Sequence, residues 1–512
     1  MSEFEYLPAN DFDLNAVAER LPHPLHVDGA GADSAERVIY DTFDRRLHAA
    51  GLRLIHEDGF LRLLRGDGRE VAALRLAAAP ETIRPAELPA VPLRDHLQRA
   101  ADVRAVLRTA QIAARRRLLS VVDDADKTVA RLVEERAVMS DGLRRGDPLR
   151  RRLYLRGVRG YDKAVERVRR LLEDELELIP AAESVEDEVR ARVDSSPVGL
   201  SSAAEVELSA DLPADRAAVA LSTRLLHTIE ANLPGTLADV DTEFLHDLRV
   251  AVRRTRSLQR ELKTVFPADE LAHFRDEFRW LQQITGPTRD LDVYLLEFDD
   301  FATAVPQALR EHLNVLRALL QEHRTRERAQ MESGLRSERT THLLGDWASF
   351  LERLPSEPVD DRPNAVTPIG DLAARRIERV YRRMIRMGEA IDDRSPHEAL
   401  HELRKKGKEL RYLLEFFAPL FPRKVTKPMV KTLKALQDTL GRFQDREVQA
   451  TMIRGLGPEL AYRPGGADAL MAMGVLVERL EDQQRNARTE FNERFAAFAS
   501  PEQRELVKKT FG

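Results

Sequence analysis

The sequence predicts a chain of two parts, an α+β domain followed by an all-α domain, and three observations support this. Short segments of alternating apolar and polar residues, separated by Asp-Gly turns, occur in the first 200 residues. A helical stretch in the second part occurs twice at a fixed separation. The 512 residues are 33% charged and only 6% aromatic, which is typical of charge-rich, mainly helical proteins. A chain of this length has room for two or more buried cores.

The composition excludes several kinds of site. The sequence has no cysteine, so disulfides, cysteine-ligated zinc, iron–sulfur clusters and thiol catalysis are excluded. The net charge is −5, so any basic surface must arise from local clustering. The acidic N-terminal segment lacks the apolar run of a signal peptide, and no apolar segment reaches the roughly 18 residues of a membrane span. We therefore expect a soluble, cytoplasmic protein with no membrane partner.

The first domain is predicted to cover residues 1–200. Residues 52–76 alternate around Asp-Gly pairs and predict a strand–turn–strand arrangement, and residues 120–139 predict a further hairpin. Residues 93–107 and 161–176 have the apolar spacing of helices. Strands combined with two helices indicate an α+β unit.

The second domain is predicted to cover residues 215–505 and contains an internal repeat. HDLRVAVRRTRSLQRELKTVFP (246–267) aligns without a gap with HELRKKGKELRYLLEFFAPLFP (401–422), 155 residues later. Other positions recur at the same separation: Leu281-Gln282 with Leu436-Gln437, Gly286 with Gly441, and Asp290 with Asp445. We predict a duplicated helical unit with copies at about 215–355 and 366–505, and a helix end at the Phe-Pro of each copy.

Residues 397–401 read HEALH, which fits the zinc-site pattern H-E-x-x-H. The repeat keeps only one of the two histidines, because His401 aligns with His246 whereas His397 aligns with Thr242. Ser395 and Glu398 also form the pattern of a capping box, with Ser395 as the N-cap. The sequence therefore predicts no metal at this position.

One face of each repeated helix carries cations at helical spacing. Like charges at this spacing destabilise a helix by a few tenths of a kcal/mol per pair, and no glutamate interrupts the series. A solvated face, or ion pairs to acids on a neighbouring helix, would explain one such series. Its recurrence in both copies favours a surface that binds a polyanion. The two series are His246, Arg249, Arg253, Arg256 and Arg260, and His401, Arg404, Lys408 and Arg411.

Two further cationic series lie near the second copy. One comprises Arg375, Arg379, Arg382 and Arg386, and the other comprises Lys424, Lys427, Lys431 and Lys434. Arg224, Arg289 and Lys405 complete the predicted polyanion-binding set. Together these side chains suit a long, flexible polyanion.

The two repeated segments, with TRDLDV (288–293) and LGRFQD (440–445), resemble the CHAD family, the conserved-histidine α-helical domain, over roughly residues 215–505. The resemblance implies two similar four-helix bundles that bind inorganic polyphosphate in a basic channel between them. It also implies that the two cationic series with His246 and His401 are the binding residues, and that the protein is found at polyphosphate granules. Gly407 and Glu409 depart from the first copy.

YDTFDRRLHAAGLRL (40–54) resembles the CYTH family of triphosphate-tunnel enzymes, which often precede a CHAD domain. The resemblance implies an eight-stranded antiparallel barrel in which an E-x-E-x-K motif binds metal and phosphate. Glu3 and Glu5 are present here, but Leu7 stands at the lysine position. Ile55 and Glu57 stand in place of expected cations, and Arg75 is a candidate to replace a strand lysine.

These departures predict a degenerate, non-catalytic barrel without a cofactor, because carboxylates hold a metal but cations must hold the triphosphate. Glu3 and Glu5 would bind Mg²⁺ or Mn²⁺ only in an active barrel. The predicted function is polyphosphate binding. The alternatives are a metal-dependent triphosphatase or polyphosphate-processing enzyme and a nucleic-acid-binding protein. Against the last, no aromatic residues are interleaved with the first cationic series.

Overall fold

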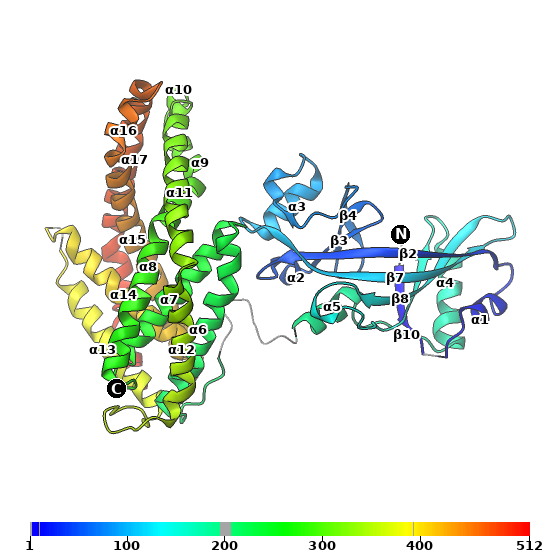
Figure 1. Cartoon of the computed structure of the whole chain (residues 1–512), viewed down its shortest axis with the longest axis horizontal. Helices are drawn as coiled ribbons and strands as arrows, with labels where there is room; N and C mark the ends of the chain where they lie inside the picture. Colours follow the sequence, from blue (N-terminus) through cyan, green and yellow to red (C-terminus); the bar gives the residue numbers. More distant parts are fainter. Residues whose placement is uncertain (1–2, 10, 195–205, 393) are drawn as a thin grey trace. The chain divides into compact units, whose positions relative to one another are not determined.

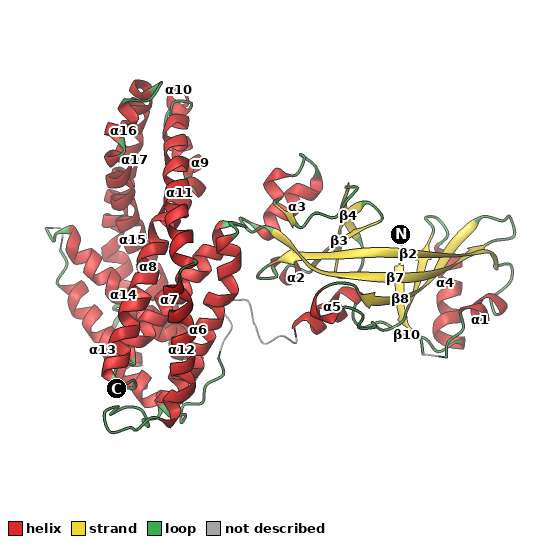
Figure 2. Ribbon diagram, in the orientation of Figure 1, coloured by secondary structure: helices red, strands yellow, loops and turns green. Residues whose placement is uncertain are grey.

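The computed structural model describes residues 3–9, 11–194, 206–392 and 394–512. The chain divides into two compact units, Met1–Ser201 and Ser202–Gly512. The first unit is built around a β-sheet and the second from helices (Figures 1 and 2). Within the described ranges, no helix has the length and apolar character needed to cross a membrane.

An antiparallel sheet of ten strands forms the first unit. The strands are β1 (Glu3–Leu7), β2 (His26–Thr42), β3 (Leu52–Glu57), β4 (Phe60–Arg65), β5 (Glu70–Arg75), β6 (Thr82–Ile83), β7 (Val106–Val122), β8 (Thr128–Met139), β9 (Arg152–Gly157) and β10 (Ile179–Pro180). Their order is β10-β1-β9-β8-β7-β2-β3-β4-β5, and β6 pairs with β7. The strands β3 to β5 and the β7–β8 hairpin lie where the sequence alternates.

The sheet is open, so the expected closed barrel is not what the described strands form. β3 pairs with β2 only at Val38–Tyr40, near the C-terminal end of that long strand. β9 pairs with the part of β8 that lies opposite residues 116–121 of β7, and these in turn pair with residues 27–33 of β2. The two edges are therefore offset along β2 and β7, and no pairing between β5 and β10 joins them.

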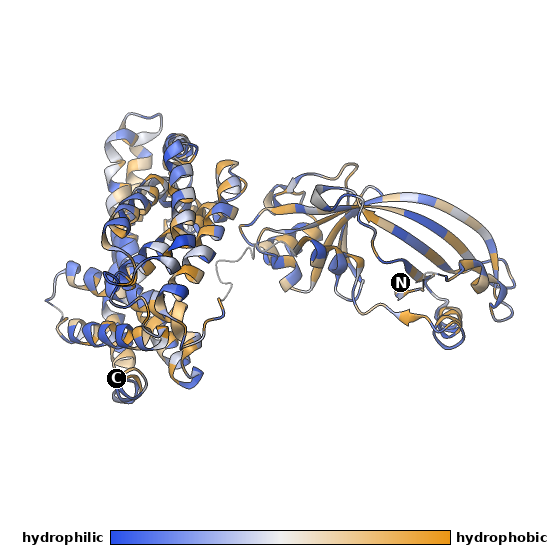
Figure 3. Cartoon of the chain, turned by 60° about the horizontal axis from the view of Figure 1, so that its bottom comes forward, coloured by the Kyte–Doolittle hydropathy of each residue, from blue (hydrophilic) through white to orange (hydrophobic). Residues whose placement is uncertain are grey.

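The two faces of the sheet have different character. Register places Leu119, Leu132 and Leu155 on one face, where they pack with α4 (Asp162–Arg170). Arg116 and Glu135 lie side by side on the other. This alternation along the strands is visible in Figure 3. The other helices of the unit are α1 (Leu14–Glu19), α2 (Arg46–Ala49), α3 (Pro92–Ala101) and α5 (Val185–Asp194). The predicted helix 93–107 is shorter than expected because β7 begins at Val106.

The second unit consists of helices whose starting points repeat. They are α6 (Ala214–Leu237), α7 (Thr242–Glu261), α8 (Ala268–Leu296), α9 (Phe298–Ala304), α10 (Gln307–Arg310), α11 (Leu313–Leu335), α12 (Glu338–Arg353), α13 (Ile369–Glu389), α14 (His397–Phe417), α15 (Arg423–Gly455), α16 (Gly457–Ala461), α17 (Gly466–Phe498) and α18 (Pro501–Phe511). The helices α6, α7 and α8 each begin 155 residues before α13, α14 and α15, respectively.

Two expectations about helix ends were wrong. Pro267 and Pro422 do not end α7 and α14, which stop several residues earlier; each proline is the N-cap of the helix that follows. A proline suits this position because it lacks the N–H that a helix start cannot use. The N-cap of α14 is Pro396 rather than Ser395. The Ser395 hydroxyl instead bonds to Asp392, accepting from its N–H at 2.9 Å.

The hydrophobic core of the helical unit is shared between the two copies. One cluster joins residues of α6, α7 and α8 with residues of α13, α14 and α15, including Leu248 and Leu403. A second cluster joins α8, α9 and α11 with α15, α16 and α17. Neither cluster is restricted to one copy, so the predicted pair of duplicated four-helix bundles is not confirmed by this packing.

Candidate anion-binding site

The repeated helices α7 and α14 pack against each other in the helical unit. The Arg253 guanidinium of α7 lies 5.9 Å from the centroid of the Tyr412 ring of α14. The positive charge of Arg253 also acts on Lys408, its counterpart at the 155-residue separation. The two cationic series therefore approach each other at Arg253 and Lys408, where α7 and α14 pack.

In the first copy, Arg249 is anchored to α8. Its Nη1 donates to the Gln282 carbonyl oxygen at 2.9 Å and to the Thr285 hydroxyl oxygen at 3.0 Å. A Cβ at Gly286 would lie 3.5 Å from that nitrogen, so the glycine allows the guanidinium to lie close to the α8 backbone. Burial lowers the pKa of Arg249, although Asp290 opposes this shift. The guanidinium is thus partly removed from water, and the nearby negative charge offsets its positive charge only in part.

In the second copy, the corresponding Arg404 contacts α15. It donates to Asp445 at 2.8 Å, and a Cβ at Gly441 would lie 3.7 Å from its Nη2. His401 Nδ1 lies 2.6 Å from Gln444 Oε1. Burial, together with the charges of Arg404 and Arg253, lowers the pKa of Lys408 to about 8, against an opposing effect of Asp445.

Arg256 is a further cation of α7 whose positive charge is not balanced by a neighbouring carboxylate among the described residues. It donates to Gln282 Oε1, a neutral acceptor. Burial lowers the pKa of Arg256, and the cations of Arg279, Arg260 and Arg275 lower it further. Arg260 is bound to Glu261 at 2.7 Å and is therefore better compensated.

A first cavity of about 620 Å³ lies along α14 and α15. Its lining includes five cations and two carboxylates: Arg404, Lys408, Arg411, Arg442 and Arg494, with Asp438 and Asp445. A volume of this size accommodates a small molecule or part of a chain. The lining has more positive than negative side chains, as an anion requires.

A second cavity of about 850 Å³ lies between α6, α14 and α15. Its charged lining consists of six cations and one carboxylate: Arg224, Arg254, Arg411, Arg423, Lys427 and Lys434, with Glu415. Arg411 and Gln437 line both cavities, so the two cavities adjoin at these side chains. Leu221, Leu225 and Leu414 form part of its apolar wall.

Six of the predicted binding residues line these cavities and twelve do not. Those that line neither are His246, Arg249, Arg253, Arg256, Arg260, Arg289, Arg375, Arg379, Arg382, His401, Lys405 and Lys431. Arg375, Arg379 and Arg382 are exposed on α13. Arg289 of α8 donates to the carbonyl oxygen of Thr242, the first residue of α7, at 3.0 Å. Lys405 pairs with Glu402.

Sequence reasoning missed four cations of the cavities: Arg254, Arg423, Arg442 and Arg494. Arg442 lies within the LGRFQD segment, so its place in the repeat was a usable signal. Arg494 comes from α17, and only knowledge of which helices pack together could have found it.

The HEALH histidines bind separate acceptors on α15. His397 Nδ1 lies 2.9 Å from Glu447, and the His397 ring packs edge-on against Phe443. His401 contacts Gln444. Across the described ranges, no cluster of three or more histidine, aspartate or glutamate side chains is arranged to hold a metal ion.

In the first unit, the polar face of the sheet carries a buried network of ion pairs. Arg37 pairs with Glu57 at 3.0 Å, with Glu135 at 3.3 Å and with Glu186 of α5 at 3.3 Å. Arg116 donates to the same Glu57 and pairs with Glu135 at 3.0 Å. Burial opposes the charged forms, yet these carboxylates raise the pKa of Arg37 and Arg116. The cations of the sheet are therefore compensated within the protein.

The predicted metal residues belong partly to this network. The Glu5 carboxylate accepts a hydrogen bond from Arg152, which also pairs with Glu188 at 2.7 Å. Burial raises the pKa of Glu5, against the effect of Arg152. A guanidinium on this carboxylate competes with a divalent cation, so Glu5 fits an ion-pair network better than a metal site. The Glu3 side chain lies outside the described residues.

Ile55, which stands in place of an expected cation, is buried. Arg75, the candidate replacement for a strand lysine, is exposed on β5. Glu57 pairs with two arginines. Sequence reasoning overlooked Arg53 on the same strand, which pairs with Glu186 at 2.9 Å.

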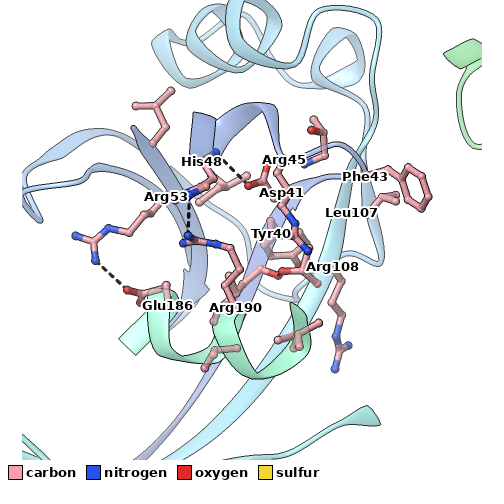
Figure 4. Close-up of a pocket in the computed structure, with 18 residues that line it drawn as sticks. Tyr40, Asp41, Phe43, Arg45, His48, Arg53, Leu107, Arg108, Glu186 and Arg190 are labelled. Carbon is pink, nitrogen blue, oxygen red and sulfur yellow. Dashed lines mark hydrogen bonds and ion pairs between the residues drawn. The ribbon is translucent and has the colours of Figure 1, made fainter. Parts of the chain in front are cut away.

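A pocket of about 240 Å³ lies beside this network, between β2, β3, β7 and α5 (Figure 4). Arg53 extends toward Glu186 at its edge (Figure 4). Arg190 Nη1 lies 2.9 Å from His48 Nε2, and Asp41 accepts from the backbone N–H groups of Leu47 and His48. These polar groups already bond to one another or to the backbone, so the pocket does not present a set of unpaired cations to a ligand.

Comparison with known proteins found similarity in the helical unit. Residues 220–454 match the model of the CHAD domain. The crystal structure of the CHAD domain from the plant Ricinus communis is similar, with a TM-score of 0.50 and 25% identity, over 58% of this chain and 96% of that one. Together, these two matches support a CHAD domain at residues 220–454.

Further matches come from bacteria. PptA from Streptomyces chartreusis has a TM-score of 0.43 and 17% identity, over 56% of this chain and 99% of that one. Two uncharacterized proteins from strains of Mycobacterium tuberculosis are 26% identical over 245 residues. This alignment covers 46% of the present chain and 44% of each relative, so the chain spans less than half the length of the curated relatives it matches.

Proposed function

We propose that the helical unit binds inorganic polyphosphate along the facing cationic sides of α7 and α14. The observation that carries this proposal is the placement of the cations: Arg249 and Arg256 bond to neutral acceptors on α8, and Lys408 lines a cavity whose lining includes five cations and two carboxylates. Cations held in this way lack sufficient negative charge around them. A linear polyanion supplies that charge along its whole length, with arginine binding phosphate oxygens through two N–H groups.

The sheet unit supports the proposal by contrast. Its buried Arg37 and Arg116 have raised pKa values because glutamates surround them. A triphosphate entering this face would have to displace Glu57 or Glu135 from both arginines. We therefore propose that this unit is a degenerate CYTH-like domain without triphosphatase activity.

The duplication belongs to the same proposal. Helices that begin 155 residues apart place Arg249 and Arg404 against equivalent glycines of α8 and α15. We infer that the unit arose by internal duplication, and that each copy provides one side of a common polyphosphate site. The cytoplasm and its polyphosphate granules are the proposed location.

One titration series tests the function. The full-length protein is titrated with long-chain polyphosphate, tripolyphosphate and duplex DNA at one salt concentration. We expect long-chain polyphosphate to bind most tightly, since it alone contacts cations from both copies. Affinity should fall steeply with added salt, because the release of counterions on binding becomes less favourable. Equal affinity for DNA and polyphosphate would reduce the site to a generic anion surface and contradict the proposal.

A further inference from the structure

Gln437 on α15 is a buried amide whose hydrogen-bonding groups are unused. Its relative exposure is 9%, and neither Oε1 nor Nε2 has a partner among the described residues. The side chain lies close to α14, because a Cβ at Gly407 would be 3.3 Å from Nε2. A buried amide without partners costs folding free energy, and native structures rarely keep one without a reason.

The corresponding residue of the first copy is not in this state. Gln282, 155 residues earlier, accepts a hydrogen bond from Arg256. The counterpart of Arg256 is Arg411, which donates to Glu415 at 2.6 Å. Glu415 stands where the first copy has Arg260, so the second copy offers Arg411 a carboxylate, and Gln437 lacks the donor that Gln282 has.

Gln437 also occupies a distinctive position, since it and Arg411 line both cavities of the helical unit. Beyond this junction, the second cavity contains Lys427 and Lys434, one above the other on α15, and Arg423 at the start of that helix. Among the described residues, none of these three forms an ion pair. Lys431, on the same helix, lines neither cavity.

We propose that the two cavities form one path, in which a polyphosphate chain held by Arg404 and Lys408 continues past Gln437 into the second cavity. This inference rests on the proposed polyphosphate binding and deepens it. On binding, the Gln437 side chain turns from α14 into the junction, where its Nε2 donates to a phosphate oxygen, and Lys427 and Lys434 bind the phosphates that follow. The residues that hold the chain along this path, Arg404, Lys408, Gln437, Lys427 and Lys434, all belong to the second copy, so the site is functionally asymmetric although the helices repeat.

The test compares matched pairs of variants in the full-length protein, with long-chain polyphosphate and tripolyphosphate as probes at low salt. Lys427→Ala is paired with Lys431→Ala. Gln437→Met is paired with Gln484→Met, because Gln484 is equally buried, has an unpartnered Nε2 and lines neither cavity. Tripolyphosphate is short enough to remain in the first cavity, so it isolates the contribution of the second.

We expect Lys427→Ala and Gln437→Met each to weaken the binding of long-chain polyphosphate about fivefold to tenfold. This loss corresponds to the removal of one hydrogen bond to a charged group. Lys427→Ala should leave tripolyphosphate affinity within about twofold, and both control variants should bind like wild type. Thermal unfolding of Gln437→Met should occur at the same or a higher temperature, since no bond within the fold is lost. A merely structural glutamine would not combine retained stability with weakened binding.

Two results separate the possible failures. If the wild-type protein binds long-chain polyphosphate but Lys427→Ala and Lys431→Ala have equal effects, the path into the second cavity is wrong and the proposed function stands. Wild-type affinity in a folded Gln437→Met variant would likewise overturn the role of the amide. If the wild-type protein binds no polyphosphate, the proposed function itself fails.

Discussion

Arg254 on α7 donates to the Glu415 carboxylate on α14 across 2.8 Å, and this ion pair joins the two copies of the repeat. The same carboxylate accepts from Arg411, so one acid restrains two arginines that line the second cavity. Among the residues that the structure describes, Glu415 is the only carboxylate in the lining of that cavity. It therefore both connects the helices and limits the positive charge available to a ligand.

Removal of this carboxylate should strengthen anion binding. We expect Glu415→Gln to raise polyphosphate affinity about threefold to tenfold, because two arginines become available to phosphate oxygens. Isothermal titration calorimetry at fixed salt measures the change. Glu322→Gln, which removes the partner of Arg463 and lies in neither cavity, serves as the control. A lower affinity in Glu415→Gln would show that the pair with Arg254 positions the site.

Polyphosphate binding should depend on pH through Lys408. Burial, Arg404 and Arg253 lower the pKa of this ammonium to about 8, and Arg411 adds to the effect while Asp445 opposes it. We expect affinity to fall between about pH 7 and about pH 9 as Lys408 loses its proton, and binding near pH 8 to take up protons. Lys408→Arg should remove this dependence, since arginine stays charged. An unchanged pH profile in that variant would contradict the assignment.

The same shift predicts how the ligand-free fold responds to pH. The folded pKa of Lys408 lies below its unfolded value of 10.5, so the unfolded chain binds more protons between the two values. The contribution of Lys408 to stability therefore becomes less unfavourable as pH rises through about 8 toward 10.5. Denaturant unfolding of the wild type and of Lys408→Met at several pH values checks this sign, and a parallel pH dependence in both would refute it.

In the sheet unit, loss of Glu57 should be costly. Burial alone would raise the pKa of Glu57, but Arg37 and Arg116 lower it, so its stabilising contribution is lost as pH falls through the folded pKa. Glu57→Gln leaves these two buried arginines short of negative charge and should cost about 3–5 kcal/mol. The exposed pair of Arg62 and Glu70 gives a matched control: Glu70→Gln should cost about 1 kcal/mol or less. Calorimetric unfolding of the full chain measures both, and equal effects would contradict a buried network.

The sheet unit should not hydrolyse tripolyphosphate with Mg²⁺ or Mn²⁺. Arg37, Arg116 and Arg152 are each engaged by the protein's own glutamates, and Glu5 is bound to Arg152. Release of inorganic phosphate from tripolyphosphate is the measurement. Turnover that Glu5→Gln abolishes would show that the network opens and that the unit is an enzyme.

The sequence predicted the classes of both units because their signals are local. Alternation specifies the strands β3 to β5 and β7 to β8, and helical spacing specifies α7 and α14. Closure of the sheet is not local, since it depends on where β3 and β9 pair along strands of seventeen and twelve residues. The shared core also escaped prediction, because a repeat reveals two copies but not how their apolar faces combine.

The candidate site was predictable along each helix and not between helices. The cationic faces of α7 and α14 follow from spacing alone, and so does their equivalence at 155 residues. Lys427 and Lys434 were grouped with Lys424 and Lys431, but only the first two line the second cavity. Gln437 carries no charge, so composition gave no reason to select it; its significance appears only from its burial and missing partners.

Charge reversal at Arg253 and Lys408 tests most directly the claim that both copies bind one polyphosphate. These side chains occupy equivalent positions on facing helices. Binding of long-chain polyphosphate to Arg253→Glu, Lys408→Glu and the exposed control Lys508→Glu is measured at one salt concentration, with folding verified by circular dichroism. We predict that each of the first two variants loses at least about tenfold in affinity while Lys508→Glu binds like wild type. Unchanged affinity in both folded reversal variants would contradict a shared site on α7 and α14.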